Sequence, residues 1–152
     1  MIQVFGTPDE GIQYSPRPGA YCVLFDDLGQ IAAVEVSGKW LLPGGGIEAG
    51  ESAAIALERE FREETGLMPF DPQPMGQTGE YMKSLDGLRS EYVIAHLFYA
   101  TAHRVVGIPS ETDHGLVWLD QQIASTALFR PGQQWAVGEA IRLLRHLKRH
   151  PE

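Results

Sequence analysis

Three glutamates near the middle of the chain have the residue type and the spacing of a metal-binding patch. Glu60, Glu63 and Glu64 stand at positions i, i+3 and i+4, which are neighbours on the surface of a helix. Like charges so close repel one another, and hard divalent cations with oxygen ligands relieve that repulsion. A backbone carbonyl from the glycine run at 44–46 would add a ligand and leave positions for water and substrate phosphate. The pattern therefore indicates metal-assisted chemistry on an anionic substrate.

The simpler interpretation of such a cluster is a solvated acidic helix face, which is common in soluble proteins. The neighbouring residues favour the metal site. The glycines at 44–46 place adaptable backbone ahead of the helix, Arg59 can pair with a carboxylate and fix its orientation, and Phe61 can anchor the same turn in the core.

The glutamates belong to a longer pattern. It consists of Gly, five residues, Glu, seven residues, Arg-Glu, an apolar residue, any residue, Glu-Glu, any residue, Gly and an apolar residue. A chance match at one start point is on the order of 10⁻⁹ at average residue usage. The segment resembles the signature box of the Nudix hydrolases, MutT-like proteins, with no fixed position missing. The fixed positions are Gly45, Glu51, Arg59, Glu60, Phe61, Glu63, Glu64, Gly66 and Leu67.

This resemblance implies an α/β fold, namely an α/β/α sandwich with a mixed sheet between helices, in which the box forms loop-helix-loop. It implies that water attacks phosphorus and cleaves the pyrophosphate bond of a nucleoside diphosphate linked to another moiety. The implied cofactor is Mg²⁺ or Mn²⁺, and a homodimer is compatible with the family. Glu51 and Arg59 would orient the cluster. By motif position, the metal ligands would be the Gly44 carbonyl, Glu60, Glu63 and Glu64.

The box does not identify the general base. In similar proteins the base comes either from the box helix, here Glu63 or Glu64, or from a later loop. The later loop supplies Glu111 and Asp113 just before an apparent strand, and we expect Glu111 to be an additional ligand or the base. The competing interpretation is a polar surface loop. Weaker candidates are Glu80 and Glu91. His114 could contact the substrate, but an isolated loop histidine is more often incidental.

The elements that must position these residues follow from the apolar pattern. Residues 51–65 predict a helix that Gly66 closes, with an inward face of Ala53, Ala54, Leu57 and Phe61. Residues 20–25 and 31–36 predict two strands of a hairpin, because 26–29 supplies turn residues. The remaining expectations are an arm or loop at 6–19, a short apolar run at 40–42, β-rich segments at 74–84 and 90–102, a strand at 116–119 and an amphipathic helix at 133–149.

Composition narrows the partners. The 152 residues predict one domain, 1–152, and the net charge of −8 argues against a broad basic surface for a nucleic-acid polymer. A small phosphate compound remains compatible if cations offset the charge. Cys22, the only cysteine, lies in an apolar run and predicts a buried thiol without a disulfide. Since no apolar stretch reaches the ~20 residues of a membrane helix and no secretory signal is visible, we expect a cytoplasmic protein without membrane contact.

Two other functions fit the same fold. A nucleotide-binding module that does not hydrolyse its ligand would be expected to lose box carboxylates, and this chain keeps all of them. A diphosphate isomerase has no evident Cys–Glu pair here. The substrate, a small nucleoside diphosphate derivative, is not specified further. Arg17 and Arg89 could reach a phosphate, and Trp40, Tyr81 and Tyr92 could stack on a base.

Overall fold

Two long neighbouring strands form the centre of the fold. The computed structural model describes residues 2–150, in which β7 (Gln73–Lys83) pairs antiparallel with β8 (Ser90–Ala100). Every second residue of β8 from Glu91 to Leu97 is buried, as expected for a strand with one face in the core. On its other side β8 runs parallel to β2 (Ser15–Leu24). With β1 (Gln3–Phe5) and β5 (Gly44–Gly46) at the edges, these strands form a mixed sheet in the order β1-β7-β8-β2-β5.

A second, three-stranded sheet has the order β10-β3-β4 and contains β3 (Ile31–Val36), β4 (Lys39–Leu41) and β10 (Gly115–Leu119). The predicted hairpin between β2 and β3 is reduced to a single bridge, Phe25 with Ile31. Both edges of β2 are already bonded, to β8 and to β5, so β3 continues into the other sheet. The predicted turn is present, and the Asp26 carboxylate accepts hydrogen bonds from the backbone N–H groups of Leu28 and Gln30.

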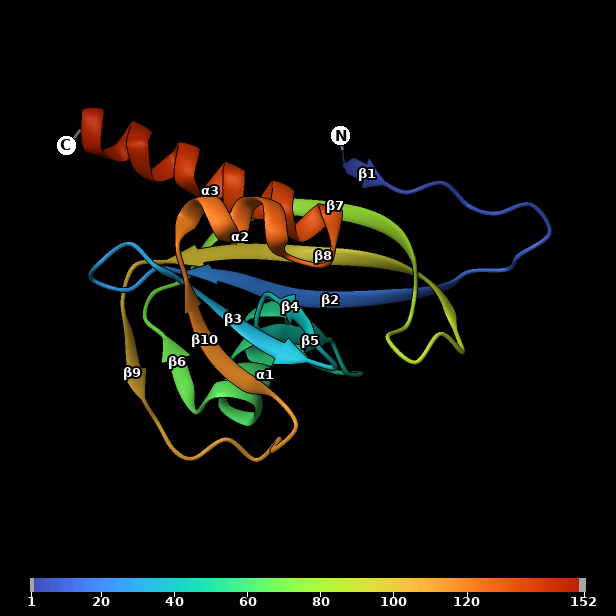
Figure 1. The fold of residues 1–152 in the computed structure, drawn as a ribbon, viewed down its shortest axis with the longest axis horizontal. Helices are drawn as coiled ribbons and strands as arrows, with labels where there is room; N and C mark the ends of the chain where they lie inside the picture. Colours follow the sequence, from blue (N-terminus) through green and yellow to red (C-terminus); the bar gives the residue numbers. More distant parts are fainter. Residues whose placement is uncertain (1, 151–152) are drawn as a thin grey trace.

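Helices cover both faces of the five-stranded sheet (Figure 1). α1 (Ala53–Thr65) packs on Ala20, Cys22 and Leu24 of β2, whereas Val23 points to the side of α2 (Gln121–Ala127) and α3 (Pro131–Arg149). The predicted α/β/α sandwich with a mixed sheet is therefore confirmed. Cys22 is a buried free thiol, as predicted. No helix between residues 2 and 150 combines the length and the apolar character that a membrane crossing requires.

Local signals set the ends of α1. The Ser52 hydroxyl accepts a hydrogen bond from the N–H of Ile55, and Gly66 closes the helix at a φ of 69°. The predicted inward face was wrong at Ala54, which is exposed, while Ala56 is buried instead. The helix is rotated so that Ala56, and not Ala54, faces the sheet. The sequence does not distinguish the two, because both are alanines at the edges of the apolar stripe.

One other expectation needs correction, and some elements were not predicted. Residues 15–19 belong to β2 and not to an arm, because the pairing with β8 extends from Ser15 with Glu91 to Leu24 with Ala100 despite two prolines. The helix α2 and the short strands β6 (Leu67–Pro69) and β9 (His103–Val105) were not predicted. β6 and β9 pair antiparallel and bring the segment that follows β9 to the end of α1.

Candidate active site

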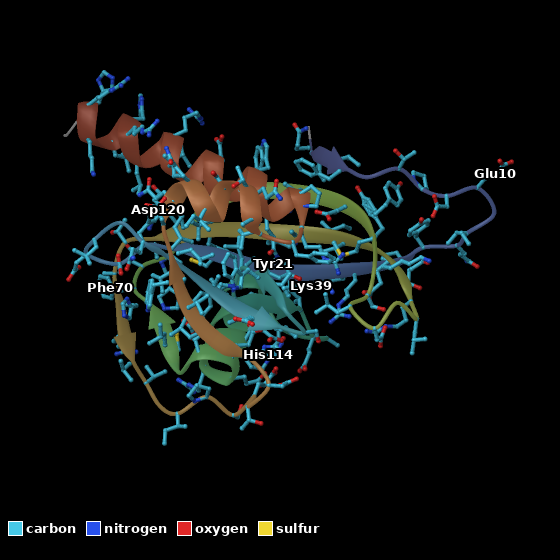
Figure 2. The ribbon with its side chains drawn as sticks, viewed as in Figure 1. Glu10, Tyr21, Lys39, Phe70, His114 and Asp120 are labelled. Atoms are coloured by element: carbon cyan, nitrogen blue, oxygen red, sulfur yellow. The ribbon has the colours of Figure 1, made fainter. Side chains whose placement is uncertain are left out.

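A cleft of about 560 Å³ opens on the sheet face that carries Arg17 and Tyr21. The glycine strand β5 and two glutamates of α1, Glu60 and Glu64, form one end of it. The first turn of α3 and the strand β7 form another part of the lining. In Figure 2, Tyr21 lies on β2 near the middle of the molecule and His114 lies on the loop that leads into β10.

Arg59 connects the predicted supporting residues. Its Nε and Nη2 atoms donate to the two carboxylate oxygens of Glu51 at 2.7 and 2.9 Å, a bidentate geometry. Its Nη1 donates to Glu60 at 2.9 Å, and Nη2 also donates to the Gly46 carbonyl at 2.9 Å. The Arg59 guanidinium holds the pKa of Glu51 near 2, with the Glu48 backbone N–H acting in the same direction. One guanidinium thereby fixes the helix, the loop before it and the glycine strand relative to one another.

The glycine strand and the box glutamates fit closely together. The Gly44 N–H donates to Glu64 Oε1 at 2.8 Å, and a Cβ added to Gly45 would stand 2.5 Å from the Glu60 carboxyl carbon. Gly44 has a φ of 141°, and a Cβ at this position would clash with the Ala20 carbonyl oxygen. The sequence therefore uses glycine here because backbone approaches both a neighbouring strand and the carboxylates.

The loop between β9 and β10 places Glu111 and His114 at the same cluster. The Val106 N–H donates to the Gly66 carbonyl at 2.8 Å, and the Glu111 N–H donates to the Glu63 carbonyl at 2.9 Å. The C-terminal turn of α1 thus holds the loop in place. Asp113 of the same loop is exposed and lies farther out, with its carboxylate 3.9 Å from His114 Nε2.

His114 bridges two carboxylates. Its Nδ1 lies 2.8 Å from Glu64 Oε2, and its Nε2 lies 3.2 Å from Glu111 Oε2. The structure therefore places this loop histidine within the carboxylate cluster, a contact that the sequence did not predict. Only the pairing of β6 with β9 and the docking of the loop on α1 bring it to Glu64, so the linear sequence gives no signal for this contact.

Two sets of side chains place their ligand atoms within 4.8 Å of one another, and Glu111 belongs to both. The first contains Glu64, Glu111 and His114, and the second contains Glu60, Glu63 and Glu111. Burial raises the pKa of Glu64 to about 8, and the neighbouring carboxylates Glu60, Glu111 and Glu63 add to the rise, against the Gly44 N–H. Burial also raises the pKa of Glu60. A divalent cation would offset the free-energy cost of keeping these carboxylates charged, so the donor set fits a hard metal ion.

The other candidates are distributed over the cleft and the core. Arg17 and Arg89 line the cleft, and Arg17 forms an ion pair of 3.1 Å with Glu91. Tyr81 and Tyr92 pack edge to face with ring centroids 4.6 Å apart, and neither lines the cleft. Trp40 packs against the core. The aromatic ring that does line the cleft is that of Tyr21, which the sequence analysis did not select.

Comparison with known proteins agrees with this geometry. The family model described as NUDIX domain matches residues 15–135. The chain belongs to the Nudix family. It is therefore a Nudix pyrophosphohydrolase, a hydrolase of pyrophosphate bonds in nucleoside diphosphate derivatives generally.

Individual relatives agree with this assignment. An uncharacterised Nudix hydrolase, YvcI of Bacillus subtilis, is 31% identical over 73% of this chain and 70% of its own length. The nucleoside triphosphatase NudI of Escherichia fergusonii is 32% identical over 68% of this chain and 75% of its own length. Among solved structures, the NUDIX domain of Shewanella oneidensis NrtR, crystallised with ADP ribose, superposes with a TM-score of 0.70. That pair is 17% identical, with 90% of this chain and 94% of the other covered, and shows the shared fold.

Proposed function

We propose that this protein is a divalent-metal-dependent hydrolase that cleaves the pyrophosphate bond of a nucleoside diphosphate linked to another moiety. The observation that carries the proposal is the pair of ligand sets that share Glu111 at one end of the cleft. Carboxylates held this close repel one another, and a bound cation offsets their negative charge. The same cation offsets the negative charge of a pyrophosphate group. An oxygen-rich set suits Mg²⁺, with Mn²⁺ as the alternative ion.

The proposed ligands are the Glu60, Glu63 and Glu64 carboxylates and the Gly44 carbonyl. Glu51 acts through Arg59, which orients Glu60. A bound divalent cation would neutralise phosphate charge and lower the pKa of a coordinated water.

For the general base we propose Glu111. Both oxygens of Glu64 are engaged, one by the Gly44 N–H and the other by His114, whereas the Glu111 side chain is 36% exposed at the cleft. Glu63 is exposed to the same extent, but its Oε2 lies 3.5 Å from Arg59 Nη1, so an ion pair occupies this carboxylate. Glu111 would take a proton from the attacking water. The bond between the attacked phosphorus and the bridging oxygen then breaks, and two phosphate-bearing products leave.

The relatives indicate which compounds to test first. NudI is named a nucleoside triphosphatase, so nucleoside triphosphates are the first choice. The NUDIX domain of NrtR was crystallised with ADP ribose, so ADP ribose is the second test compound. The second candidate function is nucleotide binding without hydrolysis.

The central prediction concerns Glu64. With a panel of nucleoside triphosphates and ADP ribose, the wild type should release phosphate-bearing products with Mg²⁺ and none with EDTA. Glu64→Gln removes the negative charge of one proposed metal ligand, so the cation should bind less well. The rate should therefore fall on the order of 100-fold or more. The matched control is Glu58→Gln, an exposed glutamate on the same helix, which should keep the wild-type rate. A fully active Glu64→Gln enzyme would exclude the metal site, and binding without turnover in the wild type would favour the second function.

A separate variant tests the base. Glu111→Gln should lower kcat by roughly 100-fold or more at saturating Mg²⁺, because the amide cannot accept the water proton. If saturating Mg²⁺ restores the wild-type kcat, Glu111 is a ligand and not the base.

A further inference from the structure

The cleft contains a second buried carboxylate, far from the metal ligands. Glu80 is only 7% exposed, and its Oε1 accepts a hydrogen bond of 2.8 Å from the Gly132 N–H. Its Oε2 forms no hydrogen bond and no ion pair with any of residues 2–150. In that part of the chain, no fully buried side-chain oxygen or nitrogen lacks a hydrogen-bond partner. Oε2 is therefore accessible, and the space that Glu80 lines is the cleft.

Two cationic side chains that line the same cleft, those of Arg130 and Arg17, have other partners. Arg130 donates to the Lys83 carbonyl at 2.9 Å and lies over the Phe129 ring. Arg17 is paired with Glu91. Burial raises the pKa of Glu80, while the Gly132 N–H and the charge of Arg130 favour the carboxylate form. Glu80 is thus a largely buried residue with one accessible oxygen, Oε2, that pairs with no cation or donor among residues 2–150.

A purely structural role explains only one of the two carboxylate oxygens of Glu80. Gly132 lies in the first turn of α3, and the residue that precedes the helix, Arg130, provides no side-chain cap. Glu80 Oε1 caps the helix instead, which needs one acceptor. A Cβ at Gly132 would stand 2.6 Å from that oxygen, so the glycine is what allows the close approach. The cap uses Oε1 and leaves Oε2 without a partner among residues 2–150, and Glu80 is one of the residues that line the cleft.

The sheet gives the distance between Glu80 and the metal end. The glycine strand β5 and the strand β7 are separated by β2 and β8. Three strand spacings amount to about 14 Å. Thr78, Glu80 and Met82 alternate along β7 with their side chains on the same cleft-lining face. A nucleotide whose phosphates lie at β5 would extend across this face, with its base at β7.

We propose that Glu80 selects the nucleobase of the substrate, its free Oε2 accepting a hydrogen bond from the exocyclic amino group of adenine, guanine or cytosine. This inference rests on the proposed function, since it takes the phosphates to lie at the glutamates of α1. Uracil and thymine present a carbonyl oxygen where cytosine presents its amino group. Two acceptors would then face each other, which disfavours the binding of uracil and thymine. Phosphate is excluded from this end for the same reason.

Cytidine and uridine nucleotides provide the sharpest comparison, because they differ in the base edge and share ribose and phosphates. The probes are the non-hydrolysable α,β-methylene diphosphates of both nucleosides, titrated calorimetrically in the presence of Mg²⁺. The wild type should bind the cytidine probe roughly 10–100-fold more tightly, as expected for one hydrogen bond to a charged acceptor. Equal affinities, or no binding of either probe, would overturn the proposal without any variant.

The variant Glu80→Gln tests the residue itself. The amide oxygen keeps the bond from the Gly132 N–H, and the amide NH₂ group then faces the cleft as a donor. The preference should disappear or reverse in favour of the uridine probe, while the thermal midpoint stays close to that of the wild type. If Glu80 is only a helix cap, Glu80→Gln should lower the affinity for both probes by the same factor, and that result would refute base selection. The matched control is Glu35→Gln on β3, an exposed glutamate outside the cleft lining.

The two proposals fail in different ways. A base preference without any hydrolysis would refute the proposed function and leave the role of Glu80 intact. Hydrolysis of cytidine and uridine triphosphates with the same KM would refute the role of Glu80 and leave the proposed function intact.

Discussion

Glu64 is buried, is surrounded by other carboxylates and has both of its oxygens held in place. Its two oxygens contact the Gly44 N–H and His114, and neighbouring carboxylates surround it. A group fixed in this way cannot turn away from its neighbours to relieve repulsion. In the metal-free protein its remaining means of relief is to bind a proton.

This leads to a prediction about stability without metal. The pKa of Glu64 is raised from 4.5 to about 8 in the folded protein, so between these values the folded state binds more protons than the unfolded state. The free energy of unfolding in EDTA should therefore decrease as the pH rises through this window, and level off above pH 8. Its contribution is on the order of 1–3 kcal/mol. Urea unfolding at several pH values gives the slope.

Glu64→Gln is the comparison for this slope. The variant should lose most of the decrease, while the smaller effects of Glu60 and Glu80, whose pKa values burial also raises, act in both proteins. Above pH 8 the metal-free variant should be the more stable protein. Identical slopes for wild type and variant would show that Glu64 is not strained in this way.

The sequence predicted part of this residue-scale arrangement. Spacing alone indicated that Glu60, Glu63 and Glu64 share a helix face. The resemblance to Nudix proteins, and not spacing, placed Glu111 near the site, and the structure brings Glu111 to the cluster. The contacts of His114 and Glu80 depend on long-range pairing, and neither residue stands in a local pattern that differs from an ordinary loop or strand.

At the scale of elements, the glycine strand β5 is the part that ties the sheet to the metal end. It pairs with β2 on one side and contacts the glutamates of α1 on the other. Its three residues were expected to be adaptable backbone, whereas in the structure they form an ordered edge strand. The sequence missed this strand because glycines have low β-propensity, and the pairing with β2 outweighs it.

Gly44→Ala tests this element. The new methyl group would clash with the Ala20 carbonyl oxygen, at a φ of 141° that alanine rarely adopts. The free energy of unfolding should fall on the order of 3 kcal/mol, and the Mg²⁺-dependent rise of the thermal midpoint should shrink. Chemical unfolding measures the first effect and thermal unfolding with and without Mg²⁺ the second.

Gly138→Ala provides the control for this substitution. Gly138 lies in α3 with open space around it, so alanine there should be neutral or stabilising by about 0.5–1 kcal/mol. A wild-type stability of Gly44→Ala would show that β5 can move away from β2 at little cost.

On the scale of the whole molecule, the sequence predicted the layers better than their connections. Periodicity located α1, α3, β3, β7, β8 and β10 to within a few residues, because each buries one regular face. The division into two sheets was not predictable in this way. It follows from which strands occupy the edges of β2, and those partners come from distant parts of the chain. The short pair β6–β9 has no pattern of its own and still determines where the Glu111 loop lies.

The parallel pairing of β2 with β8 also has a consequence for how the protein is made. The pairs Ser15–Glu91 and Leu24–Ala100 can form only after β8 has been synthesised. The buried hydrogen bond from the Leu42 N–H to the Gln133 side chain can form only after the start of α3 has been synthesised. A chain emerging from the ribosome therefore exposes α1 and its apolar stripe long before the sheet that covers it exists. Such non-local topologies fold slowly and leave intermediates prone to aggregation. Yield at high expression temperature should thus be limited by folding time before it is limited by the stability of the finished protein.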